Sequence, residues 1–131
     1  MARAQQVIHK RPALEQQLGF SMSVGVGNTL YISGLPSADQ QGGTLFPNDM
    51  RAQIQHIYTE LAEIAAERGF SFADVVKETV YTLDLEQFLA NADARLSFFK
   101  DVAAPAATWI QVAKMFAPGM LLEVELTLQR E

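Results

Sequence analysis

The segment that most constrains the fold is 121–128, LLEVELTL, because its side chains alternate strictly in character. Successive side chains of a β-strand point to opposite faces of the sheet. One face is wholly apolar, and we expect it to pack against helices: Leu122, Val124, Leu126 and Leu128. The other face carries two carboxylates about 7 Å apart among less polar neighbours: Leu121, Glu123, Glu125 and Thr127.

Two further segments have the three- and four-residue apolar period of helices. The first can be capped by Asn48 or Asp49 and ended by Gly69 in the left-handed conformation. Its apolar positions are Ile54, Ile57, Tyr58, Leu61, Ile64 and Ala65. The second begins with Asp84 and Gln87 in a capping-box pattern. Its apolar positions are Leu85, Phe88, Leu89, Ala92, Leu96 and Phe99.

Strands account for most of the remaining chain. Segments 74–83 and 106–113 have strand composition, 20–35 is a hairpin that turns at Gly27–Asn28, and 4–8 is a short edge strand stopped by Pro12. The order β, ββ, α, β, α, ββ predicts an α+β fold, with one mixed or antiparallel sheet and two helices on one face. A length of 131 residues predicts a single domain, 1–131.

The amino-acid composition argues against several classes of binding partner. The net charge of −5 and the scattered basic residues argue against nucleic acid. The chain has no cysteine, and His9 and His56 stand far apart, so we expect no disulfide, no metal site and no cofactor. No apolar run reaches the roughly 20 residues of a membrane span, and the start lacks the apolar core of a signal peptide. A cytoplasmic protein without a membrane partner is the expectation.

The sheet face opposite the helices predicts self-association. Besides residues of 121–128, it receives from the neighbouring strand either Ala107, Trp109 and Gln111, or Thr108, Ile110 and Val112. A sheet face that is free of helices yet partly apolar typically marks a protein interface. We therefore expect an oligomer.

Four segments in the same order resemble the RidA/YjgF family of reactive intermediate deaminases, also described as endoribonuclease L-PSP-like. They are VGNTLYISGLPS (26–37), LAEIAAERGFSFADVVKETVYTLDLEQF (61–88), PAATWIQVAKM (105–115) and LLEVELTL. Together they span about 110 residues of the sequence. The resemblance implies a chorismate-mutase-like fold and a homotrimeric barrel with small-molecule clefts between subunits.

In the family's enzymes, the resemblance implies hydrolysis of an enamine or imine of the 2-aminoacrylate type to a keto acid and ammonia. Glu123 matches the glutamate that orients the attacking water, and Ser33 matches a serine that lines the cleft. Phe20 stands where a tyrosine often supplies a hydroxyl. Ala107 replaces the arginine that grips the substrate carboxylate, and Trp109 stands where a small residue is usual.

Two functions remain open from these residues. The first is an enzyme without the arginine, which hydrolyses an enamine or imine other than the 2-aminoacrylate type. Glu123 would be its general acid and base, with Trp109 and Phe20 as apolar walls. The second is a non-catalytic trimer that binds a ligand in the same cleft or acts as a regulator, as the loss of both the arginine and the hydroxyl suggests.

Overall fold

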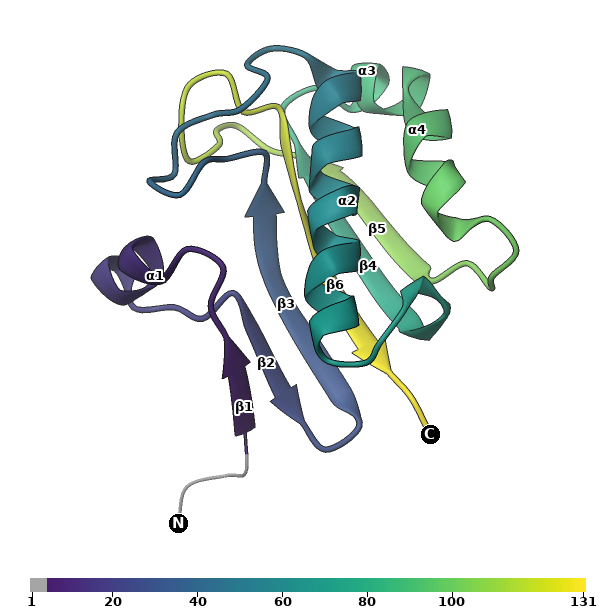
Figure 1. Cartoon of the computed structure of the whole chain (residues 1–131). Helices are drawn as coiled ribbons and strands as arrows, with labels where there is room; N and C mark the ends of the chain where they lie inside the picture. The colour runs from purple at the N-terminus through teal and green to yellow at the C-terminus, as the bar shows by residue number, and fades with distance from the viewer. Residues whose placement is uncertain (1–4) are drawn as a thin grey trace.

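A computed structural model describes residues 5–131 of the chain. Six strands form one sheet: β1 (Gln5–Ile8), β2 (Ser23–Val26), β3 (Thr29–Pro36), β4 (Val75–Thr82), β5 (Ala106–Gln111) and β6 (Leu122–Gln129). Their spatial order is β1-β2-β3-β6-β4-β5, and only the pair β4 and β5 is parallel. The last strand of the sequence therefore lies in the middle of the sheet (Figure 1).

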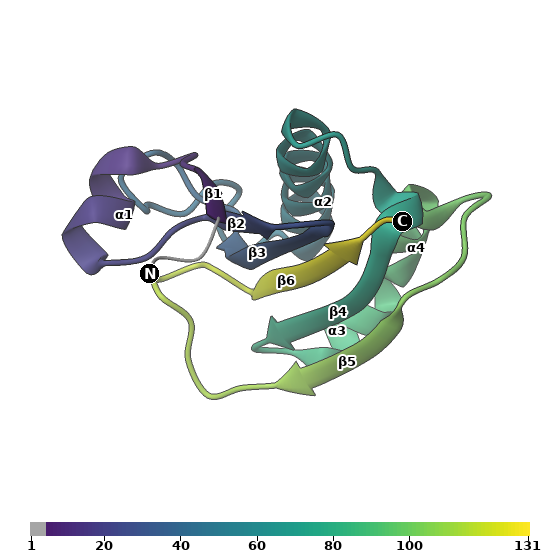
Figure 2. The ribbon, with the colours of Figure 1, turned by 90° about the horizontal axis from the view of Figure 1, so that it is seen from below.

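Helices cover one face of this sheet. They are α2 (Met50–Glu67), α3 (Leu85–Ala90) and α4 (Ala92–Leu96), with 3₁₀ turns η1 (Phe72–Asp74) and η2 (Ser97–Phe99). Figure 2 shows α2, α3 and α4 on the same side of the strands, while over the described chain the other side carries no helix. We call this uncovered side the open face. The predicted α+β class is confirmed, as is the placement of helices on one face.

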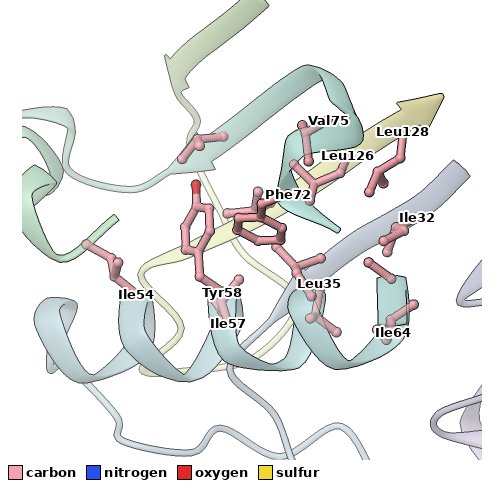
Figure 3. Close-up of a cluster of buried hydrophobic side chains, with 14 of the residues drawn as sticks. Ile32, Leu35, Ile54, Ile57, Tyr58, Ile64, Phe72, Val75, Leu126 and Leu128 are labelled. Atoms are coloured by element: carbon pink, nitrogen blue, oxygen red, sulfur yellow. The ribbon is translucent and has the colours of Figure 1, made fainter. Parts of the chain in front are cut away.

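The core lies between α2 and the sheet (Figure 3). The Asp49 carboxylate caps α2 by accepting a hydrogen bond from the Ala52 N–H, at 3.1 Å. All six apolar positions predicted for this helix are buried, and Gly69 adopts a φ of +78° just beyond its end. The four apolar positions predicted for β6 are also buried, which confirms the alternation in LLEVELTL.

The second predicted helix is divided. Asn91, with φ −113° and ψ 15°, leaves the helical conformation and separates α3 from α4. Leu96, after the break, is 61% exposed rather than buried, and Leu89, before it, is 49% exposed. Arg95 takes the inward position on α4 instead.

A helix that the sequence analysis missed, α1 (Pro12–Leu18), follows β1. The edge strand already ends at Ile8, and Pro12 instead begins this helix, because its fixed φ suits the first turn. The buried Glu15 carboxylate accepts hydrogen bonds from the N–H groups of Lys10, Arg11 and Met22, which joins α1 to the start of β2. Of the predicted first strand, Ala4 lies outside the described residues.

Candidate functional site

Glu123, on the central strand β6, lines a cavity of about 110 Å³ at the end of the sheet near α1. We call it the Glu123 cavity. Its walls come from α1, the strands β2 and β3 with their flanking loops, and the loop before β6. The lining residues are Arg11, Leu14, Leu18, Phe20, Met22, Gly34, Pro36, Ala38, Gly42, Phe116, Met120 and Glu123. The walls are therefore mostly apolar around one carboxylate.

An irregularity in β3 makes room for this carboxylate. Ile32 lies opposite Leu126 and Leu35 opposite Val124, so two residues of β3, Ser33 and Gly34, oppose a single residue of β6. Such bulges are common beside functional sites. A Cβ atom on Gly34 would lie only 2.8 Å from Glu123 Oε1. A side chain at position 34 would therefore require the Glu123 carboxylate to shift from its observed position.

Among the side chains that the structure describes, none of opposite charge is paired with the Glu123 carboxylate. Within residues 9–131, no hydrogen bond or ion pair joins it to another side chain or to the backbone. Burial raises the pKa of Glu123 above its ordinary value, and the nearby Glu125 carboxylate raises it further. A raised pKa makes the carboxyl group a better proton acceptor than an ordinary glutamate, which suits a general base that later returns the proton.

Glu125, two residues further along β6, is differently placed. It accepts a hydrogen bond of 2.7 Å from the hydroxyl of Tyr81 on β4, which also raises the pKa of Tyr81. Glu125 lines a second cavity on the open face together with Tyr31, Ser33 and Lys77. The two acidic residues of β6 therefore lie in different environments.

The structure separates the residues that the sequence analysis placed in one site. Phe20 lines the Glu123 cavity, as expected for an apolar wall. Ser33 lines the second cavity, and its hydroxyl donates to the carbonyl of Ser21 at 2.6 Å. Phe20 and Glu123 are thus brought together within one chain, while Ser33 lies on the adjoining side of the bulge.

Ala107 and Trp109 lie on the opposite face from Glu123. In the parallel pair, Ala107 aligns with Glu78 and Trp109 with Val80, both of which are buried under the helices. The Trp109 indole N–H donates to Glu78 Oε1 at 2.8 Å, and its ring packs edge-on against Phe88. The sequence left open which residues of β5 lie on the open face, and the second alternative is observed, with Thr108 and Ile110 on that face. Trp109 therefore lines no wall of the Glu123 cavity within one chain, which differs from its expected role.

Trp109 belongs instead to a buried polar cluster that the sequence analysis missed. Glu78 is fully buried and accepts hydrogen bonds from Tyr58 Oη at 2.6 Å and from the Arg95 guanidinium at 2.9–3.1 Å. Burial, followed by the Glu78 charge, raises the pKa of Tyr58 well above its ordinary value. All members are satisfied, so this cluster holds β4, β5, α2 and α4 together.

Arg11 is a second residue that the sequence analysis missed. Only 3% exposed, it contributes to the wall of the Glu123 cavity. Its Nε donates to the carbonyl of Asp39, and its Nη2 donates to the carbonyl of Ala38 and pairs with Glu60 at 2.9 Å. Nη1 is enclosed and has no hydrogen-bond partner in the described chain. No sequence spacing connects position 11 with position 123, so only the tertiary fold reveals this proximity.

The sheet order, the helices on one face and the acidic cavity define a small α+β protein of the chorismate-mutase-like fold. The chain belongs to the endoribonuclease L-PSP family, also known as RidA/YjgF, whose pattern matches residues 10–129. The resemblance seen in the sequence is thereby confirmed.

Three relatives illustrate this membership. The chain is 33% identical over 106 residues to the 2-iminobutanoate/2-iminopropanoate deaminase of Capra hircus, covering 81% of this chain and 76% of that one. It is similar to the crystal structure of the E. coli YjgF gene product, with a TM-score of 0.76, 25% identity and coverage of 86% and 88%. A Rid-family protein of unknown function from Yersinia pestis has the same fold, with a TM-score of 0.85, 22% identity and coverage of 97% and 100%.

Two broader observations complete the site. Among the described residues, no group of three or more His, Cys, Asp or Glu side chains is arranged to hold a metal ion. In the same part of the chain, no helix is long and apolar enough to cross a membrane.

Proposed function

We propose that this protein is an imine or enamine deaminase, which hydrolyses a substrate other than the 2-aminoacrylate type to a carbonyl compound and ammonia. The observation that carries the proposal is the unpaired Glu123 carboxylate in an apolar cavity, with its pKa raised by burial and by Glu125. The named activity of the goat relative, 2-iminobutanoate/2-iminopropanoate deamination, supports the reaction class.

In the proposed reaction, a water molecule hydrogen-bonded to Glu123 attacks the imine carbon. The carboxylate accepts one proton from this water as the carbon–oxygen bond forms and passes it to the imine nitrogen, which gives a neutral carbinolamine. Glu123 then takes the hydroxyl proton of the carbinolamine and delivers it to the nitrogen as the carbon–nitrogen bond breaks, so that ammonia leaves and the carbonyl compound forms. No redox partner or cofactor is needed, because water supplies the oxygen and both protons.

The exclusion of 2-aminoacrylate follows from the missing anion clamp. A bidentate guanidinium is the usual partner of a buried substrate carboxylate. Position 107 is alanine, and the Arg11 guanidinium is already engaged with Glu60 and two carbonyls. The loss of such a partner weakens binding by about 2–5 kcal/mol, or roughly 30- to 4000-fold.

We further propose that the protein works in the cytoplasm as a homotrimer, with its ligand sites at the subunit boundaries. The open face supports association, because Tyr31 and Ile110 are about half exposed there. Ala107 and its neighbours on the edge strand β5 are exposed as well, so they are available to a neighbouring chain.

A non-catalytic, ligand-binding trimer is the second candidate. It is favoured by Phe20, which offers the cavity a ring without a hydroxyl, and by Ala107, which offers no charge. In that case the cavity binds a ligand and releases it unchanged.

Turnover of two imine classes tests the proposal. An alkyl imine, which carries no carboxylate, is generated from a primary alkylamine with an amine oxidase. 2-Aminoacrylate is generated with a pyridoxal-phosphate dehydratase. We expect the protein to accelerate ammonia release from the first and not from the second, and Glu123→Gln to lower that rate by at least about 100-fold. No acceleration of either would favour the binding trimer, and brisk turnover of 2-aminoacrylate would refute the substrate assignment.

A further inference from the structure

We propose that the Glu123 cavity selects a small apolar group joined to a positively charged nitrogen, such as a protonated alkyl imine or its amine, and rejects carboxylates. This assignment names a substrate class for the proposed function and rests on the same cavity. It concerns binding, however, and therefore has a test that does not depend on turnover.

The balance of charge around Glu123 favours a cation. On the same strand and the same face, Glu125 adds a second negative charge. From β4, the neutral Tyr81 lies opposite Glu123 and donates its hydroxyl hydrogen to Glu125. From β3, the residues at the cavity are Gly34 and Pro36, which carry no charge.

In the described part of the chain, Arg11 is the one basic residue in the cavity wall, and its charge is already paired. Its Nη2 forms an ion pair with Glu60, and two backbone carbonyls accept its other hydrogen bonds. The remaining Nη1 is enclosed, so it offers no exposed donor to a ligand. The Glu123 charge is thus left without compensation, which is the condition under which a buried carboxylate recognises a cation.

The size and the lining of the cavity favour a small apolar group. An engineered apolar protein cavity of about 150 Å³ holds a benzene molecule. At about 110 Å³, the Glu123 cavity suits a group of roughly four to six heavy atoms. Phe20, Met22 and Met120 supply apolar surface around it, and Leu18 and Phe116, 52% and 60% exposed, stand at its rim.

These two features act on cations and anions in opposite ways. An ammonium or iminium N–H can form a charge-assisted hydrogen bond of about 2.7–2.9 Å to the Glu123 carboxylate. A ligand carboxylate in the same space would place two negative charges side by side, so one of them must take up a proton. The cavity therefore discriminates by charge as well as by shape.

Three ligands of nearly the same shape test this inference: isobutylammonium, isobutanol and isobutyrate. Binding is followed by NMR of ¹³C-labelled methionine methyl groups in the intact protein. We expect isobutylammonium to shift the signals of Met22 and Met120, which line the cavity, and not that of Met50, which lies at the start of α2. Its Kd should be at least about tenfold lower than that of isobutanol, with isobutyrate the weakest of the three.

The pH dependence has a defined sign. The alkylammonium keeps its charge below a pH of about 10, so the change with pH reports the protein. As the pH falls through the pKa of Glu123, the carboxylate becomes neutral and the preference for the cation is lost. Glu123→Gln should lose the same preference at every pH. Glu125→Gln, which removes only the second negative charge, should weaken it in part, and Glu86→Gln on α3, outside the cavity lining, should leave it unchanged.

Several results would overturn the inference. They are tighter binding of isobutyrate than of isobutylammonium, an unchanged cation preference in Glu123→Gln, or no shift of the Met22 and Met120 signals with any ligand. Binding of the cation without hydrolysis of any imine would instead retain this inference and reject the proposed function. The two failures are therefore distinguishable.

Discussion

At the scale of the residue, the ionised Glu123 carboxylate lowers the free energy of unfolding of the protein. Because its pKa is raised in the folded protein, folding is less favourable when the group is ionised. Below the ordinary pKa of about 4.5 the group is protonated in both the folded and the unfolded states, and the cost disappears. Above the raised pKa it is ionised in both states, and the full cost applies.

Glu123→Gln should therefore be more stable than the unchanged protein at pH 7, although we expect it to lose activity. The gain should shrink as the pH falls and vanish below about pH 4.5. Urea unfolding at several pH values measures the difference in the free energy of unfolding. A variant that is less stable than the parent at pH 7 would show that the carboxylate has a stabilising partner in the assembled protein.

Gly34 is coupled to Glu123 by steric contact. In Gly34→Ala, the new Cβ would meet the glutamate oxygen at 2.8 Å, so the carboxylate must move. We expect a loss of about 1 kcal/mol in unfolding free energy and a clear loss of isobutylammonium binding. If the contact is the cause, the stability loss disappears when Gly34→Ala is made in a Glu123→Ala background. An equal loss in both backgrounds would instead indicate backbone strain in β3.

The sequence predicts some of these residues and not others. Glu123 is identified by strict alternation along β6, which fixes its face independently of the rest of the fold. The face of Trp109 depends on the register between β4 and β5, and a shift of one residue reverses it. Arg11 and Gly34 reach the cavity through contacts between distant segments, which no local pattern records.

At the scale of the element, the buried Glu78 cluster fixes how α4 and β5 meet the sheet. Glu78→Gln would leave the Arg95 guanidinium buried without its full counter-charge. Removal of one partner from a buried pair typically costs about 3–5 kcal/mol. We expect a loss of that size in chemical denaturation, with a change in Trp109 fluorescence because its indole donates to the same carboxylate.

Arg51→Ala is the matched control. Arg51 also pairs with a residue of α4, Asp93, at 2.6 Å, but this pair lies in solvent. Exposed pairs contribute little because water and salt screen them. Equal destabilisation by the two variants would contradict the assignment of Glu78 and Arg95 as the pair that fixes α4.

The elements differ in how well the sequence predicts them, for physical reasons. The long helix α2 has an apolar recurrence from Ile54 to Ala65, a cap and a terminal glycine, so its signals agree. The helix α1 has only seven residues and is held by one buried carboxylate, Glu15, rather than by an apolar stripe. The division at Asn91 arises from a single non-helical residue inside an otherwise continuous apolar period.

At the scale of the whole molecule, the open face determines the proposed assembly. Ile110 lies on this face and is 48% exposed. Ile110→Lys should shift the protein from trimer to monomer, as measured by size-exclusion chromatography with light scattering, because a lysine cannot be buried there without a partner.

Leu96→Lys is the control for this variant. Leu96 is more exposed, at 61%, but it lies on α4, away from the open face. It should leave the mass in solution unchanged. A monomeric parent protein, or equal dissociation in both variants, would contradict the proposed trimer.

The contact between Gly34 and Glu123 has a consequence for how relatives of this protein diverge. The two positions occupy one space, so a side chain at 34 requires the Glu123 carboxylate to shift or to be replaced by a smaller group. In an aligned set of sequences, residues larger than glycine at the first position should therefore be enriched where the second position carries a shorter residue. In such lineages, loss of the acid should usually precede the appearance of a larger side chain on the facing strand.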